Sequence, residues 1–368
     1  MTEMCGTGDF GKMFNRAKPY LFTVGLQFGM AGTYVFSMAS LNHGMSRLVF
    51  VVYRNVIAAV ALAPFALFFE RKTRPKMTLS VFVQILALGF LEPVIDQGFT
   101  FLGMQYTSAS FASSVMNAVP SVTFVLAVIL RLERVKIKEL RSQAKVIGTL
   151  VSFAGALLMT LYKGPQVHLF HNPNTTHQES GNHSTQSHQH WIAGTLFIGL
   201  GCLAWSSFYI LQSITIRRYP AELSLSSLIC LVGAMESAVV ALVAEHRSQA
   251  WTIGFDYRLY GPLYTGIISS GIAYYVQGLV MKSRGPVFVT SFNPLCTIIV
   301  AALGSFILGE HLYLGSIIGS IIIAVGLYSV VWGKGKDYVD LTSPSGTTTP
   351  TKETENLQLP ISSSTNTK

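Results

Sequence analysis

Four charged side chains lie inside long apolar stretches of this sequence, where little water is available to solvate them. They are Arg54, Glu92, Asp96 and Glu236. A charge at the centre of a lipid bilayer costs about 3 kcal/mol or more, so each is a candidate for solute binding or proton transfer. Glu92 and Asp96 are four residues apart and share one helix face. Pro93 between them leaves backbone carbonyls free for other partners.

A stripe of small and polar side chains marks the stretch 106–120. At helical spacing its members share one face, which suits close packing or a solute path. They are Thr107, Ser110, Ser114, Asn117 and Ser121. A partial copy occurs at 284–297, with Thr290, Asn293 and Thr297.

The elements that position these residues are membrane helices. Of the 368 residues, 50% are hydrophobic and only 12% are charged, whereas soluble domains carry about 25% charged residues. The sequence therefore predicts an all-α integral membrane protein, whose spans need about 20 apolar residues each. Ten stretches qualify: 20–41, 48–69, 79–101, 109–130, 145–162, 192–214, 223–244, 259–281, 287–308 and 312–332.

Basic residues are unevenly distributed among the connections of these ten helices. Alternate connections, together with the N-terminal arm, carry nineteen Lys or Arg residues, and the opposite connections carry four. Because basic residues are retained on the cytoplasmic side, both termini are predicted to be cytoplasmic. This asymmetry accounts for the net charge of +9 without a nucleic-acid partner. We expect no cleavable signal peptide before the first helix.

The connection 163–191 is polar and falls on the non-cytoplasmic side by this rule. It contains six of the nine histidines, but no paired carboxylates or cysteines, so we predict neither a metal nor a cofactor. Asn174 and Asn182 begin glycosylation sequons there. The four cysteines show no disulfide or metal-binding spacing.

The two halves of the chain repeat each other. Gly148 and Gly155 in the fifth helix match Gly319 and Gly326 in the tenth at the same spacing of seven. The two striped helices correspond as well, which predicts that their asparagines face each other across a shared path. Five helices per half force the second copy to insert upside down. Inverted repeats of this kind are typical of transporters that bind their solute between the halves.

The predicted order of domains follows from the repeat and from composition. The tail is rich in Ser, Thr and Pro and cannot bury enough apolar surface to fold. The segments are a cytoplasmic arm (1–18), a first five-helix repeat (19–162), a polar His-rich linker (163–191), a second repeat (192–333) and a disordered cytoplasmic tail (334–368).

A series of short motifs occurs in a fixed order along residues 15–338. It comprises LEPVIDQ (91–97), YTSAS (106–110), NAVP (117–120), RLE (131–133), SQAK (142–145), LYKGP (161–165), YPAELS (219–224), GIAYY (271–275), RGPVF (284–288) and GLYSVVWGK (326–334). Together these motifs resemble the plant nodulin-like transporters with paired EamA domains. That family is also called the "usually multiple acids move in and out" transporters (UMAMIT) or "walls are thin"-related proteins, within the drug/metabolite transporter superfamily.

The resemblance implies ten helices in two inverted EamA-type repeats. It implies a transporter rather than an enzyme, moving amino acids or related small organic acids by alternating access, including export. Auxin or another plant metabolite is the alternative that it leaves open. The plasma membrane is favoured over the vacuolar membrane. One departure is Gly98, where the family commonly has asparagine.

An amino acid needs an anionic partner for its ammonium group and donors for its carboxylate. We assign Asp96 to the ammonium group, and Asp96 or Glu92 to proton coupling if there is any. The other candidate substrate-binding residues are Gln97, Asn117, Asn293, Gln277, Tyr274 and Arg54. Each has a structural alternative. Asp96 and the asparagines can hold helices together, and Arg54 can extend to the bilayer interface.

Other classes of protein explain the sequence less well. It has no nucleotide-binding glycine loop, no HExxH motif and no nucleophile with a base in context, so we predict no enzyme. A sugar-phosphate or nucleotide-sugar exchanger needs several buried cations, and Arg54 alone is available. A non-transporting scaffold leaves the polar stripes unexplained. The expected partners are a small-molecule substrate and the lipid bilayer, and the sequence leaves the oligomeric state open.

Overall fold

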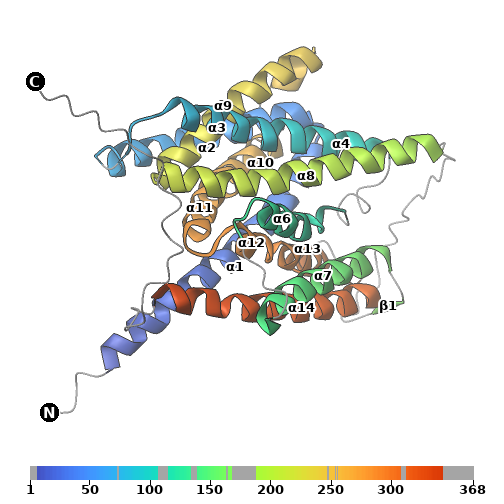
Figure 1. Ribbon diagram of the computed structural model, residues 1–368. Helices are drawn as coiled ribbons and strands as arrows, with labels where there is room; N and C mark the ends of the chain where they lie inside the picture. Colours follow the sequence, from blue (N-terminus) through green and yellow to red (C-terminus); the bar gives the residue numbers. More distant parts are fainter. Residues whose placement is uncertain are drawn as a thin grey trace, which may run out of the picture. The chain divides into compact units, whose positions relative to one another are not determined.

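The computed structural model describes residues 6–72, 74–106, 115–133, 139–162, 165–167, 188–246, 248–252, 254, 256–307 and 312–342. This part is almost entirely helical (Figure 1). Five of its helices are long and apolar enough to cross a membrane, and shorter apolar helices accompany them. The ten-helix membrane fold predicted from the sequence is confirmed.

The first half contributes five helical segments, of which the third has three consecutive parts. They are α1 (Gly6–Asn42), α2 (Arg47–Phe69), α3 (Leu79–Gly89) with η1 (Phe90–Asp96) and α4 (Gln97–Tyr106), α6 (Val119–Ile129) and α7 (Leu140–Leu161). The second half repeats this order. It contains α8 (His188–Arg218), α9 (Glu222–Ala244), α10 (Tyr257–Thr265) with η3 (Gly266–Ile272) and α11 (Ala273–Arg284), α12 (Pro286–Thr290) with α13 (Asn293–Ile307), and α14 (Leu314–Thr342).

Three helices are longer than hydropathy predicts. Helix α1 begins at Gly6, α8 at His188, and α14 ends at Thr342. The predicted arm, the end of the linker and the start of the tail are therefore partly helical. Polar residues continue the backbone hydrogen bonds of a helix without adding to its hydropathy. The sequons at Asn174 and Asn182, and stripe residues 107–114, lie outside the described residues.

The third helix of each half contains a π-helical segment at its centre. In η1 the N–H of Gln97 donates to the carbonyl of Glu92, five residues back. In η3 the N–H of Ala273 donates to the carbonyl of Ile268. Pro93 has no N–H to complete an α-helical turn, which explains the irregularity in η1.

The fourth helix of each half is also interrupted. A turn at 117–118 precedes α6, and a turn at 291–292 separates α12 from α13. Both turns lie beside a proline, Pro120 or Pro294, that cannot continue the hydrogen bonding of the preceding turn. The two striped helices therefore share their irregularity, as the repeat predicts.

Connections that are far apart in the sequence meet at the ends of the bundle. Strand β1 (Gln166–Val167), in the linker, pairs antiparallel with β2 (Leu312–Tyr313) before α14. Because successive connections alternate between the two ends of the bundle, the connections that carry His43 and Arg258 lie at this same end. There Arg258 donates to the carbonyl of His43. At the opposite end Lys282 forms an ion pair with Glu222. This alternation of ends is what ten antiparallel spans require.

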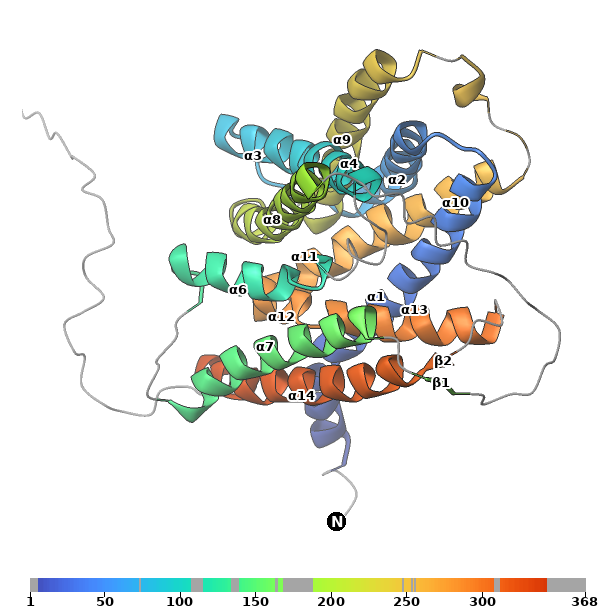
Figure 2. The ribbon, with the colours of Figure 1, turned by 90° about the vertical axis from the view of Figure 1, so that its right-hand side faces the viewer.

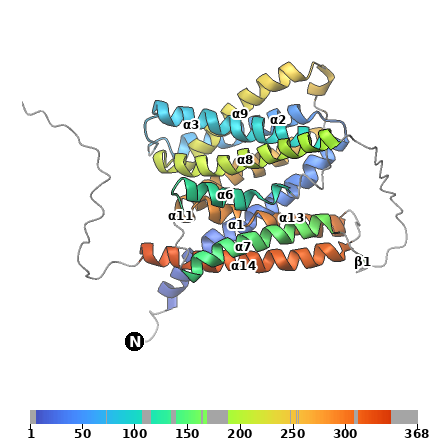
Figure 3. The same ribbon diagram turned by 45° about the vertical axis from the view of Figure 1, so that its right-hand side comes forward.

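The fifth helices of the two halves, α7 and α14, lie side by side (Figures 2 and 3). A Cβ placed on Gly148 would come within 2.6 Å of the Gly326 carbonyl oxygen. One placed on Gly155 would lie 3.0 Å from the Gly319 carbonyl oxygen. The two glycine pairs of the repeat therefore pack against each other in crossed order, as in an antiparallel pair of helices, and backbone approaches this close require small residues.

Candidate functional site

A buried ion pair joins two elements of the first half, both of which pack on α9 of the second half. Helix α2 carries Arg54 and segment η1 carries Glu92, and their side chains are 7% and 9% exposed. Nη2 of Arg54 donates to both carboxylate oxygens of Glu92, at 2.7 and 2.9 Å. Arg54 therefore does not extend to the bilayer interface. Removing one partner of such a pair leaves a buried charge and costs about 3–5 kcal/mol.

Asp96 lies one turn further along the same helix, and it has no such partner. It is 4% exposed, and within the described residues it makes no ion pair. The hydroxyl of Thr100 donates to its Oδ1 at 3.4 Å, which is a long hydrogen bond. Gly201 of α8 lies directly opposite, since a Cβ there would approach Thr100 Oγ1 to 2.6 Å. Asp96 is therefore a buried carboxyl group, packed against the second half, that has no ion-pair partner among the described residues.

Aromatic and polar side chains from three other helices surround this carboxylate. Tyr34 of α1 lies in the neighbourhood of Asp96, of Tyr209 on α8 and of Cys296 on α13. The Tyr34 side chain is nevertheless 51% exposed. Trp205 stacks on Tyr209, with ring centroids 6.3 Å apart.

The two striped helices meet through side chains, one turn away from the predicted contact. Thr297 Oγ1 donates to Asn117 Oδ1 at 3.1 Å. The amide nitrogen of Asn117 is buried without a hydrogen-bond partner in the described part of the chain. Asn293 lies within hydrogen-bonding reach of the Tyr209 hydroxyl. The predicted pair, Asn117 and Asn293, thus belongs to one polar region but does not bond directly there.

The remaining predicted residues divide between the ion pair and the surrounding core. Tyr274 of α11 is 5% exposed and lies next to Glu92 and Arg54. Its hydroxyl completes no hydrogen bond of good geometry with the described residues. Gln277 is buried, and its Oε1 also lacks a partner among those residues. For Gln97 the structure shows an intermediate exposure beside Asp96.

Glu236, the fourth charge noted in the sequence, is separate from this cluster. It lies on α9 against Gly89 of α3, where a Cβ on Gly89 would come within 2.9 Å of Glu236 Oε2. That oxygen is buried without a hydrogen-bond partner in the part of the chain that the structure describes. Its position at a helix contact favours a packing role over a role in the central site.

Three residues of the site are not found from the sequence. They are Tyr34, Tyr209 and Thr100. Tyrosine and threonine are frequent in apolar helices, and nothing in the spacing of these three marks them. Only the position of Thr100, four residues after Asp96, is a signal, because residues at that spacing are neighbours on a helix.

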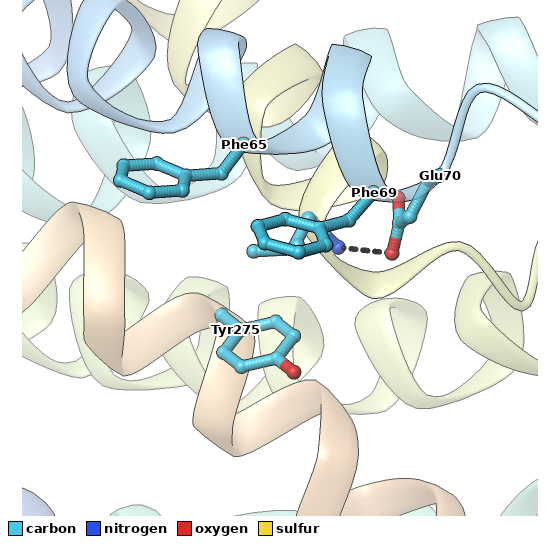
Figure 4. Close-up of a pocket in the computed structure, with 5 residues that line it drawn as sticks. Phe65, Phe69, Glu70 and Tyr275 are labelled. Carbon is cyan, nitrogen blue, oxygen red and sulfur yellow. Dashed lines mark hydrogen bonds between the residues drawn. The ribbon is translucent and has the colours of Figure 1, made fainter.

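A separate pocket of about 440 Å³ opens near the end of α2 (Figure 4). It is lined by Phe65, Phe69, Glu70, Leu223 and Tyr275. The backbone nitrogen of Leu223 donates a hydrogen bond of 2.9 Å to the Glu70 carboxylate, drawn as the dashed line in Figure 4. Glu70 thereby caps the start of α9. None of the predicted site residues lines this pocket, so we do not place the solute there.

The described residues contain no group of three or more His, Cys, Asp or Glu side chains arranged to hold a metal ion. The three cysteines in this part of the chain, Cys202, Cys230 and Cys296, are buried free thiols. The chemistry of the central cluster is therefore that of carboxylate, guanidinium, hydroxyl and amide groups. Such groups bind and orient a polar solute by charge and hydrogen bonds.

The fold and the cluster together define a helical membrane protein with two repeats and a polar site between them. The EamA-like transporter family matches residues 17–161 and 192–332, one match per repeat. The chain belongs to this family and is a multi-pass membrane transporter. The resemblance inferred from the motifs is thereby confirmed.

Similar proteins agree with this assignment. WAT1-related protein At4g08290 of Arabidopsis thaliana is 62% identical over 325 residues, covering 88% of this chain and 85% of the relative. WAT1-related protein At1g21890, from the same plant, is 53% identical over 333 residues, covering 88% and 86%. One solved crystal structure has the same fold, with a TM-score of 0.65 at 16% identity over 84% of this chain and 97% of its own.

Proposed function

We propose that this transporter moves amino acids across the membrane, and that Asp96 binds their ammonium group. One observation carries the proposal. Asp96 is 4% exposed, lies between the halves and has no cation partner among the described residues. An unpaired carboxylate in an apolar environment is costly. It becomes favourable when a solute brings the missing positive charge.

Neutral groups of the same region are suited to receive the carboxylate of an amino acid. The amide nitrogen of Asn117 is a buried donor without a partner in the described part. The Tyr209 hydroxyl and Asn293 lie close to each other, and Thr297, four residues after Asn293, donates to Asn117. Arg54 is not needed for this role, because Glu92 already neutralises it. The site therefore favours zwitterions or monocations.

This charge balance disfavours the alternative solutes. Auxin is a carboxylate anion without an ammonium group, and Asp96 would repel it. A sugar phosphate carries still more negative charge, and the nearest cation is committed to Glu92. If a proton is coupled to transport, Asp96 is the better candidate, since Glu92 would have to leave Arg54 first.

The test is transport by the purified full chain in liposomes. Labelled amino acids are supplied as a panel, together with indole-3-acetate, and uptake is measured at fixed pH. We expect uptake of one or more amino acids, and a loss of at least about tenfold in Asp96→Asn, the size expected when an ion pair with the solute is lost. Asp256→Asn is the matched control, because Asp256 caps α10 through the backbone nitrogen of Arg258.

Two results would contradict the proposal. One is transport of the auxin anion in preference to every amino acid. The other is amino-acid transport that persists unchanged in Asp96→Asn. A panel in which no solute moves would favour a non-transporting role.

We further propose that both termini face the cytoplasm and that the protein resides in the plasma membrane. The charge asymmetry between alternate connections supports the orientation. It predicts that Asn174 and Asn182 are exposed to glycosylation. A shift in gel mobility after glycosidase treatment, lost in the double variant Asn174→Gln/Asn182→Gln, would support it, and labelling of the linker from the cytoplasm would refute it.

A further inference from the structure

The contacts of Arg54 are incomplete. A guanidinium has five N–H donors, yet only Nη2 reaches Glu92, and Nε is buried without a partner among the described residues. The guanidinium thus has donors to spare in a region that contains a second carboxylate. That carboxylate is Asp96, which lies four residues after Glu92 on the same helix.

Packing fixes the backbone of α2 at this position. Gly266, the first residue of η3, packs directly on the Arg54 carbonyl oxygen, since a Cβ on Gly266 would come within 2.6 Å of it. The Arg54 backbone therefore cannot retreat from the site, and only its side chain can be redirected. In the structure that side chain is directed to Glu92 by two hydrogen bonds from Nη2.

When all three groups are ionised, as a bound cation favours for Asp96, they carry a net charge of −1. Glu92 and Arg54 cancel each other, and the remaining charge is concentrated on Asp96. If Glu92 were neutral, Arg54 would have Asp96 as its nearest anion, and the site would lose its net charge. If both carboxylates were neutral, the net charge of the cluster would become positive.

We propose that Glu92 determines the charge of the solute that the site accepts, by holding Arg54 away from Asp96. Glu92 is then a specificity-determining and positioning residue that does not itself touch the solute. The proposal rests on the proposed function, in which Asp96 binds an ammonium group. It adds that the preference for positive charge is set by a second carboxylate one turn away.

The experiment uses three probes with one side chain and three charges. They are L-leucine, a zwitterion, L-leucinamide, a cation, and 4-methylpentanoate, an anion. Binding to the purified full chain is measured by calorimetry at fixed pH and salt. The wild-type protein is expected to bind L-leucinamide and L-leucine and to reject 4-methylpentanoate.

In Glu92→Gln the affinity for L-leucinamide is expected to fall by at least about tenfold, because Arg54 then occupies Asp96. In Glu92→Gln/Asp96→Asn the order is expected to invert, with 4-methylpentanoate binding best. The informative variant is Arg54→Gln/Glu92→Gln. It removes the ion pair but restores the net charge of −1. The order of affinities for the three probes is therefore expected to return to that of the wild type.

A purely structural ion pair would not give this pattern. Removing one partner of a structural pair leaves a buried charge, and removing both partners relieves that cost, so the melting temperature would fall in Glu92→Gln and recover in the double variant. The order of affinities for the three probes would stay that of the wild type in both variants. Lys282→Gln/Glu222→Gln removes an exposed ion pair at the end of the bundle and is the matched control. Size-exclusion profiles and melting temperatures report whether each variant is folded.

The outcomes separate the two proposals. If the wild-type protein binds none of the three probes, or binds the anion best, the proposed function fails. If the wild-type protein shows the expected order and Glu92→Gln keeps it, with an L-leucinamide affinity unchanged, the role of Glu92 is overturned. Failure of the double variant to recover the order overturns it as well.

Discussion

The third helices of the two halves have the same irregularity but use it differently. Segment η1 carries Glu92 and Asp96, and it supplies all the negative charge of the central cluster. Segment η3 has the sequence GIISSGI and supplies no charge. Its Gly266 packs on the backbone of Arg54 instead. In the proposed function, the π segment of the first half binds the solute, whereas the π segment of the second half allows close approach of helices.

The π segments η1 and η3 also change the geometry of the two third helices. A π turn holds one more residue than an α turn, so it shifts the faces of the helix on either side of it. In the first half this shift sets the direction of Asp96. In the second half it brings small residues against α2, where Gly266 and Gly271 face Arg54 and Leu62. Substitutions in η1 should therefore mainly reduce transport, whereas substitutions in η3 should mainly reduce stability.

The largest effect is expected from Gly266→Ala. Its Cβ would lie 2.6 Å from the Arg54 carbonyl oxygen, so backbone must move. Overpacking of this kind costs about 1–3 kcal/mol. We expect a lower melting temperature and little transport. Gly199→Ala in α8 is the control, because a Cβ there meets nothing within 4 Å. Equal melting temperatures for the two variants would show that η3 is not a close-packing element.

Pro93→Ala should reduce transport by about tenfold without a comparable loss of stability. Alanine restores an N–H and favours an α-helical turn, which would rotate Asp96 by about 100° relative to Glu92 and Arg54. The measurement is uptake into liposomes beside a melting curve. Pro262→Ala makes the same change in the second half, before η3. Since η3 carries no charge, transport by Pro262→Ala should stay near the wild-type level.

Thr100→Val is expected to reduce the apparent affinity for an amino acid by about two- to fivefold, because Asp96 loses its one described hydrogen bond. Concentration-dependent uptake measures this as a rise in KM. Thr123→Val is the control, since the Thr123 hydroxyl is buried without a partner in the described residues. Unchanged KM in Thr100→Val would mean that Thr100 does not orient Asp96.

The smallest effect is expected from Ser270→Ala in η3. The Ser270 hydroxyl is buried and has no partner among the described residues, so its removal leaves no other described group without a hydrogen bond. Transport within about twofold of wild type is expected on that account. A much larger loss would place Ser270 in contact with the solute and would remove the contrast between the two segments.

The helical framework was predictable because hydropathy reports directly on it. The ten apolar stretches, the repeat and the matching glycines all follow from residue type and spacing, and the structure places Gly148 against Gly326. The π segments were not predictable, because one extra residue in a turn leaves no mark on hydropathy. Pro93 was the only local sign of either.

The site was predictable in its members but not in their contacts. Asp96 and Glu92 were identified because charges are rare in apolar helices. The pairing of Arg54 with Glu92 was missed, since 38 residues separate them and no periodicity relates one helix face to another. Asn117 was predicted to face Asn293, but its observed partner is Thr297, one turn further along the same helix. Sequence spacing within a helix is reliable, whereas the relative height of two helices depends on packing.

The ion pair between α2 and η1 also bears on biogenesis. Arg54 in the second span and Glu92 in the third each cost about 3 kcal/mol when they enter the bilayer unpaired. Only a short connection, from Glu70 to Thr78, separates the two spans. Insertion of the two spans together, as a hairpin with Arg54 already paired to Glu92, avoids both costs. The second and third spans should therefore leave the translocon as one unit, and Arg54→Leu should allow the second span to insert by itself in a glycosylation-mapping assay.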